Sequence, residues 1–188
     1  MARTAKKPGR SATRRGRSVP WRGVAVAAVA VAAVGALLVF DEPPPGVEFP
    51  DQGNRHISAL GDPHEDYNSS PPSSGPHLGV VADWGVASDV VPPELFVHNL
   101  EDAGVVLAYD CPDGCPDLID GLTSYVEDNG GRLLLTPYTG ISYEGTGHRA
   151  AAVAWTRVFY FDDFDATNRS ELDLFVGLYE GIDHHVGN

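Results

Sequence analysis

The amino-acid sequence predicts an α+β fold: one small mixed sheet with helices packed on it, preceded by one N-terminal transmembrane helix and a Pro-rich extended segment. Three observations lead to this prediction. An uncharged apolar run at residues 24–40 separates a basic start from an acidic remainder, and ten of the fifteen prolines lie in residues 41–93. After residue 93, short apolar runs alternate with segments in which apolar residues recur at helical spacing. The length of 188 residues suits one domain with appendages.

The charged residues divide the chain into two zones. Eight of the 13 lysines and arginines lie in residues 1–22, whereas all 26 acidic residues lie from Asp41 onward, where the net charge is −21. The apolar run between them would form a helix of ~25 Å, and Trp21 and Arg22 at the membrane interface would extend it towards a hydrocarbon core of ~30 Å. Basic residues on its amino side predict a cytoplasmic N-terminus and an extracytoplasmic remainder at the cell membrane.

A cleaved signal peptide is the alternative interpretation of the apolar run. Its outer end, residues 37–40, has no small-x-small cleavage site and no cysteine for lipid attachment, so we expect an uncleaved signal anchor. The membrane is therefore an expected partner, and the overall net charge of −13 argues against a nucleic-acid partner. A protein or ligand partner cannot be identified from the sequence. The expected parts are a basic tail at 1–22, a transmembrane anchor at 23–40, a linker at 41–51, the domain at 52–182 and a frayed tail at 183–188.

The domain is expected to begin with extended chain and turns, because the prolines of residues 52–93 exclude a long helix or a central strand. A first strand is predicted at 104–109, from a short apolar run. A helix over 117–128 follows, since its apolar residues recur at helical spacing, and residues 129–131 (Asn-Gly-Gly) end it.

A second strand is predicted at 132–137 and a longer third strand at 151–161. A last helix, capped by Asn168 or Ser170, extends through Tyr179. We expect the first two strands to be parallel, the third to be antiparallel to the second, and the helices to cover one face of the sheet.

Three segments carry a resemblance to a known family. They are residues 67–77 (YNSSPPSSGPH), residues 97–106 with VHNLE followed by GVV, and residues 154–165 with Ala-Trp leading to Phe-Asp. Over about residues 60–182 the chain resembles the bacterial family named domain of unknown function 3105. The resemblance implies a membrane-anchored extracytoplasmic protein of unestablished biochemical function. The family commonly continues His-Asn-Leu-Glu with His-Gly-Gly, where this chain has Asp102-Ala103-Gly104, so a histidine of the family is lost or replaced by Asp102.

Two of the seven histidines lie inside these motifs. His77 and His98 each have a carboxylate such as Glu101 or Asp102 nearby, and imidazole with carboxylate suits zinc or copper(II). The predicted ligands are thus His77, His98, Glu101 and Asp102, with His64 as a further candidate. The alternative is a structural role, in which hydrogen-bonded histidines hold the proline-rich segment on the domain. Because Met1 is the only methionine, a methionine-rich copper(I) carrier is excluded.

Cys111 and Cys115 enclose Pro-Asp-Gly and are predicted to form a disulfide, because paired cysteines outside the membrane usually oxidise. So short a loop contributes ~1–2 kcal/mol of stability by the loop-entropy model. A redox-active pair, or free or metal-bound thiols, are the alternatives.

Our leading functional hypothesis is a non-enzymatic binding or interaction module at the cell surface, because no complete catalytic template is present. The alternatives are a metal-binding protein that uses His77 and His98, and a hydrolytic or thiol-redox enzyme. The hydrolase alternative has Ser73 and Ser74 beside His77 but no nucleophile elbow. The acidic residues Asp162, Asp163 and Asp165 lack the spaced oxygen ligands of a calcium loop.

Overall fold

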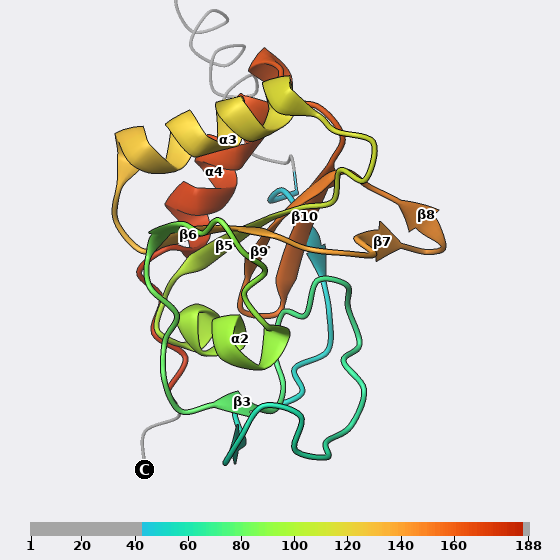
Figure 1. The fold of residues 1–188 in the computed structure, drawn as a ribbon. Helices are drawn as coiled ribbons and strands as arrows, with labels where there is room; N and C mark the ends of the chain where they lie inside the picture. Colours follow the sequence, from blue (N-terminus) through green and yellow to red (C-terminus); the bar gives the residue numbers. More distant parts are fainter. Residues whose placement is uncertain (1–42, 186–188) are drawn as a thin grey trace, which may run out of the picture. The chain divides into compact units, whose positions relative to one another are not determined.

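The computed structural model describes residues 43–185 (Figure 1). The predicted basic tail and transmembrane anchor lie outside these residues. Within 43–185, no helix combines the length and the apolar character that crossing a membrane requires.

A six-stranded mixed sheet forms the centre of the domain, as the sequence predicts, with the order β1-β10-β9-β5-β6-β4. β4 and β5 run parallel to β6, β9 is antiparallel to β5, and β10 is antiparallel to both β9 and β1. The strands are β1 (Val47–Glu48), β4 (Gly85–Val86), β5 (Val105–Tyr109), β6 (Leu133–Pro137), β9 (Ala150–Ala154) and β10 (Arg157–Phe161). β1 lies inside the predicted linker 41–51, so the domain begins earlier than expected.

Helices cover both faces of this sheet, and the expectation that they cover one face is wrong. α3 (Pro116–Asn129) and α4 (Ala166–Tyr179) lie on one side, and α2 (Pro93–Glu101) lies on the other (Figure 1). β5 explains why: Leu107 packs with α3 and α4, whereas Val106 packs with α2, and both side chains are fully buried. A strand that is apolar on both faces needs cover on both.

The helix α2 is not among the elements predicted from the sequence. Pro92 and Pro93 are compatible with the end of an extended segment, but proline is also favoured in the first turn of a helix, and Pro93 starts α2. The helix buries Phe96, Val97 and Leu100 against the sheet. Its carboxyl-terminal half also carries the buried polar residues described below.

The predicted third strand, 151–161, is a hairpin of two strands. The chain reverses at Trp155-Thr156, where Thr156 has a φ of 61°. As a result, Val153 and Phe159, which a single straight strand would place on the same face, lie in different apolar cores. β9 pairs with β5, so it does not lie beside β6 as predicted.

The last helix begins earlier than either predicted cap. Asp165 is its N-cap residue and accepts a hydrogen bond from the Asn168 backbone N–H at 2.8 Å. α3 lies within one residue of its predicted bounds at each end and is followed by Gly130 with a φ of 59°.

Extended chain in residues 52–92 packs on the α2 side of the domain. It contains β2 (His56–Ile57) and β3 (His77–Leu78), which are parallel and place His56 opposite His77. α2 packs against β3, and Figure 1 shows the two side by side. A small hairpin of β7 (Ser142–Tyr143) and β8 (Thr146–Gly147) completes the described elements.

Candidate metal centre

Four potential metal ligands converge where β2 and β3 meet α2. His56 and His77 face each other across the two-stranded ladder, while His98 and Glu101 lie one turn apart on the same side of α2. One nitrogen or oxygen atom from each of these four side chains lies within 4.8 Å of the other three. Residues 45 positions apart in the chain therefore form one compact cluster, which we call the His/Glu cluster.

Glu101 is at the centre of the His/Glu cluster and is 1% exposed. Its carboxylate accepts a hydrogen bond from Asn54 Nδ2 at 2.7 Å, and its Oε2 lies 2.9 Å from His77 Nε2. Within residues 43–185, the ion-pair partners of this carboxylate are all histidines. Burial raises the pKa of Glu101, but hydrogen bonds with Asn54 and His77 and the charges of His77 and His185 together outweigh burial, so the pKa lies below its usual value. The carboxylate is therefore a buried anion without a permanently charged partner among these residues.

His77 is oriented as a metal ligand would be. Its Nδ1 lies 2.7 Å from the carbonyl oxygen of Gly75, which can only accept a hydrogen bond, so Nδ1 carries a proton. Nε2 then has a free lone pair pointing at the cluster, or carries a second proton that it donates to Glu101. A backbone carbonyl that fixes the tautomer in this way is the usual outer partner of a metal-binding histidine.

His98 provides a second nitrogen that points into the cluster. The residue is 8% exposed, and its Nδ1 has no hydrogen-bond partner among the described residues although Glu101 Oε2 is 3.4 Å away. Burial lowers the pKa of His98, which favours the neutral imidazole that binds metals. A buried nitrogen without a partner is unusual in a folded protein, and an ion would satisfy it.

His56 closes the cluster on the solvent side. Its Nε2 lies 3.5 Å from Glu101 Oε2, and its ring centroid is 5.0 Å from that of His77. The side chain is 49% exposed, whereas those of His77 and Glu101 are almost completely buried. An ion could thus reach the cluster from solvent past His56.

The carboxyl-terminal tail packs beside the cluster, so in the described part of the chain it is not frayed as predicted. The His184 backbone N–H donates to the carbonyl oxygen of Glu101 at 3.0 Å, and the His184 ring stacks on Trp155. His185 Nε2 lies 3.4 Å from Asp102 Oδ1, and these two residues form a second potential ligand group with His98.

The predicted ligands are thus distributed over three places. His77, His98 and Glu101 lie together, and Asp102 belongs to the neighbouring group with His185. His64 lies outside the His/Glu cluster, with its Nε2 4.0 Å from Glu94 Oε1. Sequence reasoning missed His56 and His185, because only the β2–β3 register and the docking of the tail bring them in, and neither has a local sequence signal.

Other sequence candidates have structural partners. Ser74 Oγ accepts from the Gln52 backbone N–H, and Ser69 Oγ donates to Ser73 Oγ, so neither buried serine is hydrogen-bonded to His77. Asp162 and Asp163 bind Arg149. Cys111 and Cys115 form the predicted disulfide.

The metal-free domain is expected to lose stability on acidification. The pKa values of both His98 and Glu101 are lowered in the fold, so as the pH falls the unfolded chain takes up protons first. The His98 contribution is lost as the pH falls below its ordinary pKa of 6.5, and the Glu101 contribution below 4.5. His185, with a pKa raised by a hydrogen bond to Asp183, acts in the opposite sense, but it is exposed and its effect is screened. Thermal unfolding with a chelator should show a melting temperature that falls from pH 7.5 to pH 5; a constant or rising value would contradict this assignment.

Ala103 adopts a backbone conformation that favours glycine. It has a φ of 67° and is 1% exposed. Replacing Ala103 by glycine is expected to raise the free energy of unfolding by about 1 kcal/mol, because the left-handed conformation costs a residue with a Cβ about that much. Chemical denaturation measures the change. A loss of stability would mean that packing of the Ala103 methyl group outweighs the backbone strain.

The comparisons with known proteins identify one family. The model of a family described as "Protein of unknown function (DUF3105)" matches residues 62–182. No curated protein and no solved structure matches the chain.

Proposed function

The chain belongs to the DUF3105 family of proteins of unknown function. We propose that it is a metal-binding protein. In this proposal the His/Glu cluster holds one zinc(II) or copper(II) ion through His56, His77, His98 and Glu101. Three imidazoles and one carboxylate are nitrogen and oxygen ligands that both ions accept.

One observation carries the proposal: the buried carboxylate of Glu101 converges with the unpartnered Nδ1 of His98 and the oriented Nε2 of His77. A purely structural role, in which histidines hold the extended segment on the domain, should satisfy these atoms with hydrogen bonds. In such a role the Nδ1 of His98 would be left without a hydrogen bond beside the buried carboxylate of Glu101. The metal-binding hypothesis is therefore preferred to the interaction-module and enzyme hypotheses, which have no comparable supporting cluster among the described residues.

Metal titration of the full chain in detergent tests the proposal. The wild-type protein should bind one equivalent of zinc(II) or copper(II), and a His77→Ala/His98→Ala double variant should bind at least about 100-fold more weakly, because two ligands are lost. His148→Ala is the matched control, since its Nδ1 is also buried without a hydrogen bond but lies near Asp162, outside the cluster. Equal affinity in all three proteins, or no binding by the wild type, would reject the proposal.

We also propose that residues 24–40 anchor the protein in the cell membrane with the domain on the extracytoplasmic side. The charge asymmetry around the apolar run and the oxidised cysteine pair support this placement. Protease treatment of intact cells should digest the domain, and protection of the domain in intact but not in lysed cells would contradict the orientation.

A further inference from the structure

The last described residues of the chain pack across the carboxyl end of α2. The Gly181 backbone N–H donates to the carbonyl oxygen of Ala103 at 2.8 Å, and the His184 backbone N–H donates to that of Glu101 at 3.0 Å. Carbonyl groups at a helix end lack a partner within the helix, and these two bonds supply one. The His184 ring also stacks on Trp155. The tail is therefore held in place by contacts that do not involve the side chain of His185.

His185 is oriented on this tail as a metal ligand would be. Its Nδ1 lies 2.8 Å from Asp183 Oδ1, and an ionised carboxylate only accepts hydrogen bonds, so Nδ1 carries a proton. A carboxylate on the far nitrogen is a usual outer partner of a metal-binding histidine. The other nitrogen, Nε2, lies 3.4 Å from Asp102 Oδ1 and is left to a proton or an ion. Asp183 thus orients His185 as the carbonyl group of Gly75 orients His77.

His98, Asp102 and His185 form a second group of potential ligands, which we call the tail group. One nitrogen or oxygen atom from each of the three side chains lies within 4.8 Å of the other two. Two imidazoles and one carboxylate suit zinc(II) or copper(II), and a site with three protein ligands keeps a coordination position for water. The tail group therefore has the composition of an open metal site, whereas the His/Glu cluster offers four protein ligands.

The tail group is also more accessible than the His/Glu cluster. The side chains of His185 and Asp102 are 45% and 35% exposed, whereas those of His77 and Glu101 are almost completely buried. An ion at the tail group would keep contact with water and would be bound less firmly than one in the cluster. The two groups thus differ as an entry position differs from a resident site.

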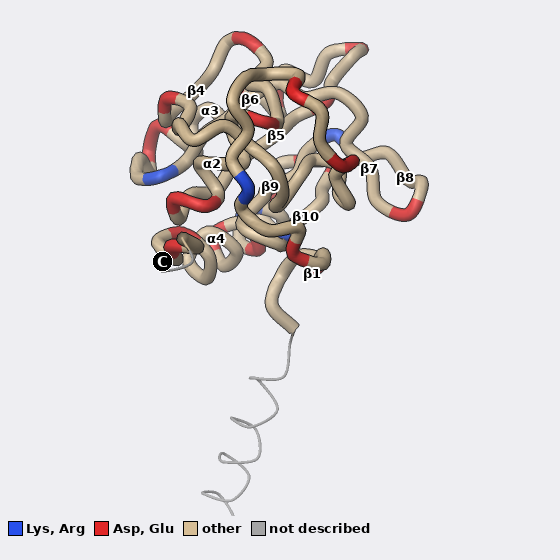
Figure 2. Tube along the Cα trace, turned by 90° about the horizontal axis from the view of Figure 1, so that it is seen from below, with Lys and Arg blue, Asp and Glu red and all other residues tan. Residues whose placement is uncertain are grey.

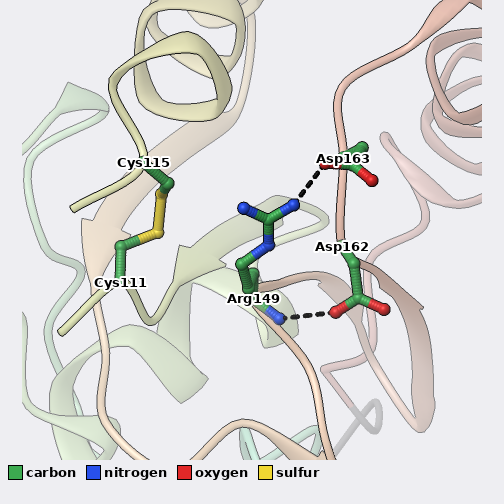
Figure 3. The surroundings of a disulfide bond; sticks show 5 residues. All are labelled: Cys111, Cys115, Arg149, Asp162 and Asp163. Carbon is green, nitrogen blue, oxygen red and sulfur yellow. Dashed lines mark hydrogen bonds and ion pairs between the residues drawn. A yellow bond between two sulfur atoms is a disulfide. The ribbon is translucent and has the colours of Figure 1, made fainter. Parts of the chain in front are cut away.

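The charge of the domain favours the approach of a cation. Acidic residues are spread around it with few basic residues among them (Figure 2). Such a distribution raises the local concentration of cations at the surface. Cys111 and Cys115, the only cysteines of the chain, are joined in a disulfide beside Arg149 and offer no thiolate that would compete for the ion (Figure 3).

His98 belongs to both groups and connects them. A neutral imidazole has one unprotonated nitrogen, so His98 binds one ion at a time and the two groups cannot both hold an ion through it. Glu101 Oε2 lies 3.4 Å from His98 Nδ1 and 3.9 Å from His185 Nε2, so its negative charge is close to both groups. An ion can therefore pass from one group to the other without losing contact with an anionic ligand.

We propose that the tail group is the exchange position of the metal centre, through which zinc(II) or copper(II) enters and leaves the His/Glu cluster. This inference rests on the proposed function. An incoming ion binds Asp102 and His185 first and keeps water at its open positions. His98 then joins the ion, which moves onto His77 and Glu101 while the tail ligands and the water leave. Release follows the same steps in reverse.

The rate of metal release from the full chain in detergent tests the proposal. Zinc(II) bound to the protein is transferred to a chromophoric chelator, at chelator concentrations above which the rate no longer rises. His185→Gln should slow release at least about tenfold, because the ion loses its exchange position and the barrier rises. The same barrier slows uptake by the same factor, so the Kd should change less than threefold. His64→Gln is the matched control, since His64 lies beside Glu94 outside both groups, and it should release zinc(II) like the wild type.

Two results would overturn the exchange position and leave the proposed function intact. Equal release rates for the wild type and His185→Gln would make the opening past His56 the route of the ion. A Kd that rises tenfold in His185→Gln would make His185 a resident ligand. In both cases the wild type still binds its ion, whereas a wild type that binds no zinc(II) would reject the proposed function and this inference together.

A variant without the cluster isolates the tail group. His56→Ala/His77→Ala removes two ligands of the His/Glu cluster and none of the tail group, so it should still bind one zinc(II) ion, more weakly than the wild type. Adding His185→Gln should weaken the remaining binding at least about tenfold, because one of three ligands is lost. No effect of His185→Gln in this background would overturn the proposal. Circular dichroism verifies the fold of these variants, and the release test, which changes only an exposed side chain, does not depend on them.

Discussion

Replacing Glu101 by glutamine is expected to reduce the affinity for zinc(II) by about 100-fold or more. Glutamine keeps the size of the side chain and one oxygen acceptor, so Asn54 Nδ2 retains a partner in the cluster. It removes the negative charge that would bind the cation, and it places a neutral amide among three imidazoles. The predicted loss therefore arises from ligand chemistry, while the fold is retained.

Competition against a chromophoric chelator measures this affinity, and circular dichroism verifies the fold. Glu94→Gln is the matched control, because Glu94 lies in the first turn of the same helix and its carboxylate contacts His64 instead of the cluster. The control should bind zinc(II) like the wild type. If Glu101→Gln binds within threefold of the wild type, Glu101 is not a ligand and the four-residue site is wrong.

Replacing Gly104 by alanine is expected to lower the free energy of unfolding by about 3 kcal/mol. A Cβ at this position would overlap the ring of Trp84 and would lie 2.7 Å from the backbone oxygen of Asn99. That oxygen is held in place, because it accepts the hydrogen bond from the Gly104 backbone N–H at 2.9 Å. The chain between α2 and β5 must therefore shift, and with it the helix end that carries Glu101.

Gly177→Ala offers a control with the opposite sign. Gly177 lies inside α4, and a Cβ there would meet no atom within 4 Å. Alanine should raise the free energy of unfolding by about 0.5–1 kcal/mol through its higher helix propensity. Urea denaturation measures both changes. A cost below about 1 kcal/mol for Gly104→Ala would show that Trp84 and the α2–β5 turn yield easily.

The sequence predicts correctly those strands and helices that are determined by the residue pattern within their own segment. The apolar runs of β5 and β6 and the helical spacing in α3 predicted those elements to within a residue or two. The β9–β10 hairpin was missed because the apolar sequence continues through Trp155-Thr156 without glycine, proline or asparagine to mark a turn. α2 was missed because Pro92-Pro93 is compatible with both the end of an extended segment and the start of a helix.

The residues of the candidate site also fall into two groups: those that the sequence identifies and those that only the fold brings together. His77, His98 and Glu101 lie in two conspicuous motifs, so chemistry alone identified them as candidates. His56 lies in the cluster because β2 pairs with β3 and places it opposite His77. His185 lies beside the cluster because the last described residues pack there. Both positions depend on contacts between distant parts of the chain. Asp102 was predicted in the same site as Glu101, but successive helical residues point in different directions, so Asp102 faces the tail.

The parallel ladder of β2 and β3 has a consequence for how the protein would resist proteases. Two of the four cluster residues lie on the extended segment and two on α2, so a bound ion would cross-link residues 56 and 77 to residues 98 and 101. A cross-link that closes a long loop restricts local opening more than one that closes a short loop. Loss of the ion would weaken the attachment of this segment to the domain, and trypsin-like enzymes would cleave faster at its exposed Arg55. Metal occupancy would then determine how long the protein survives such enzymes.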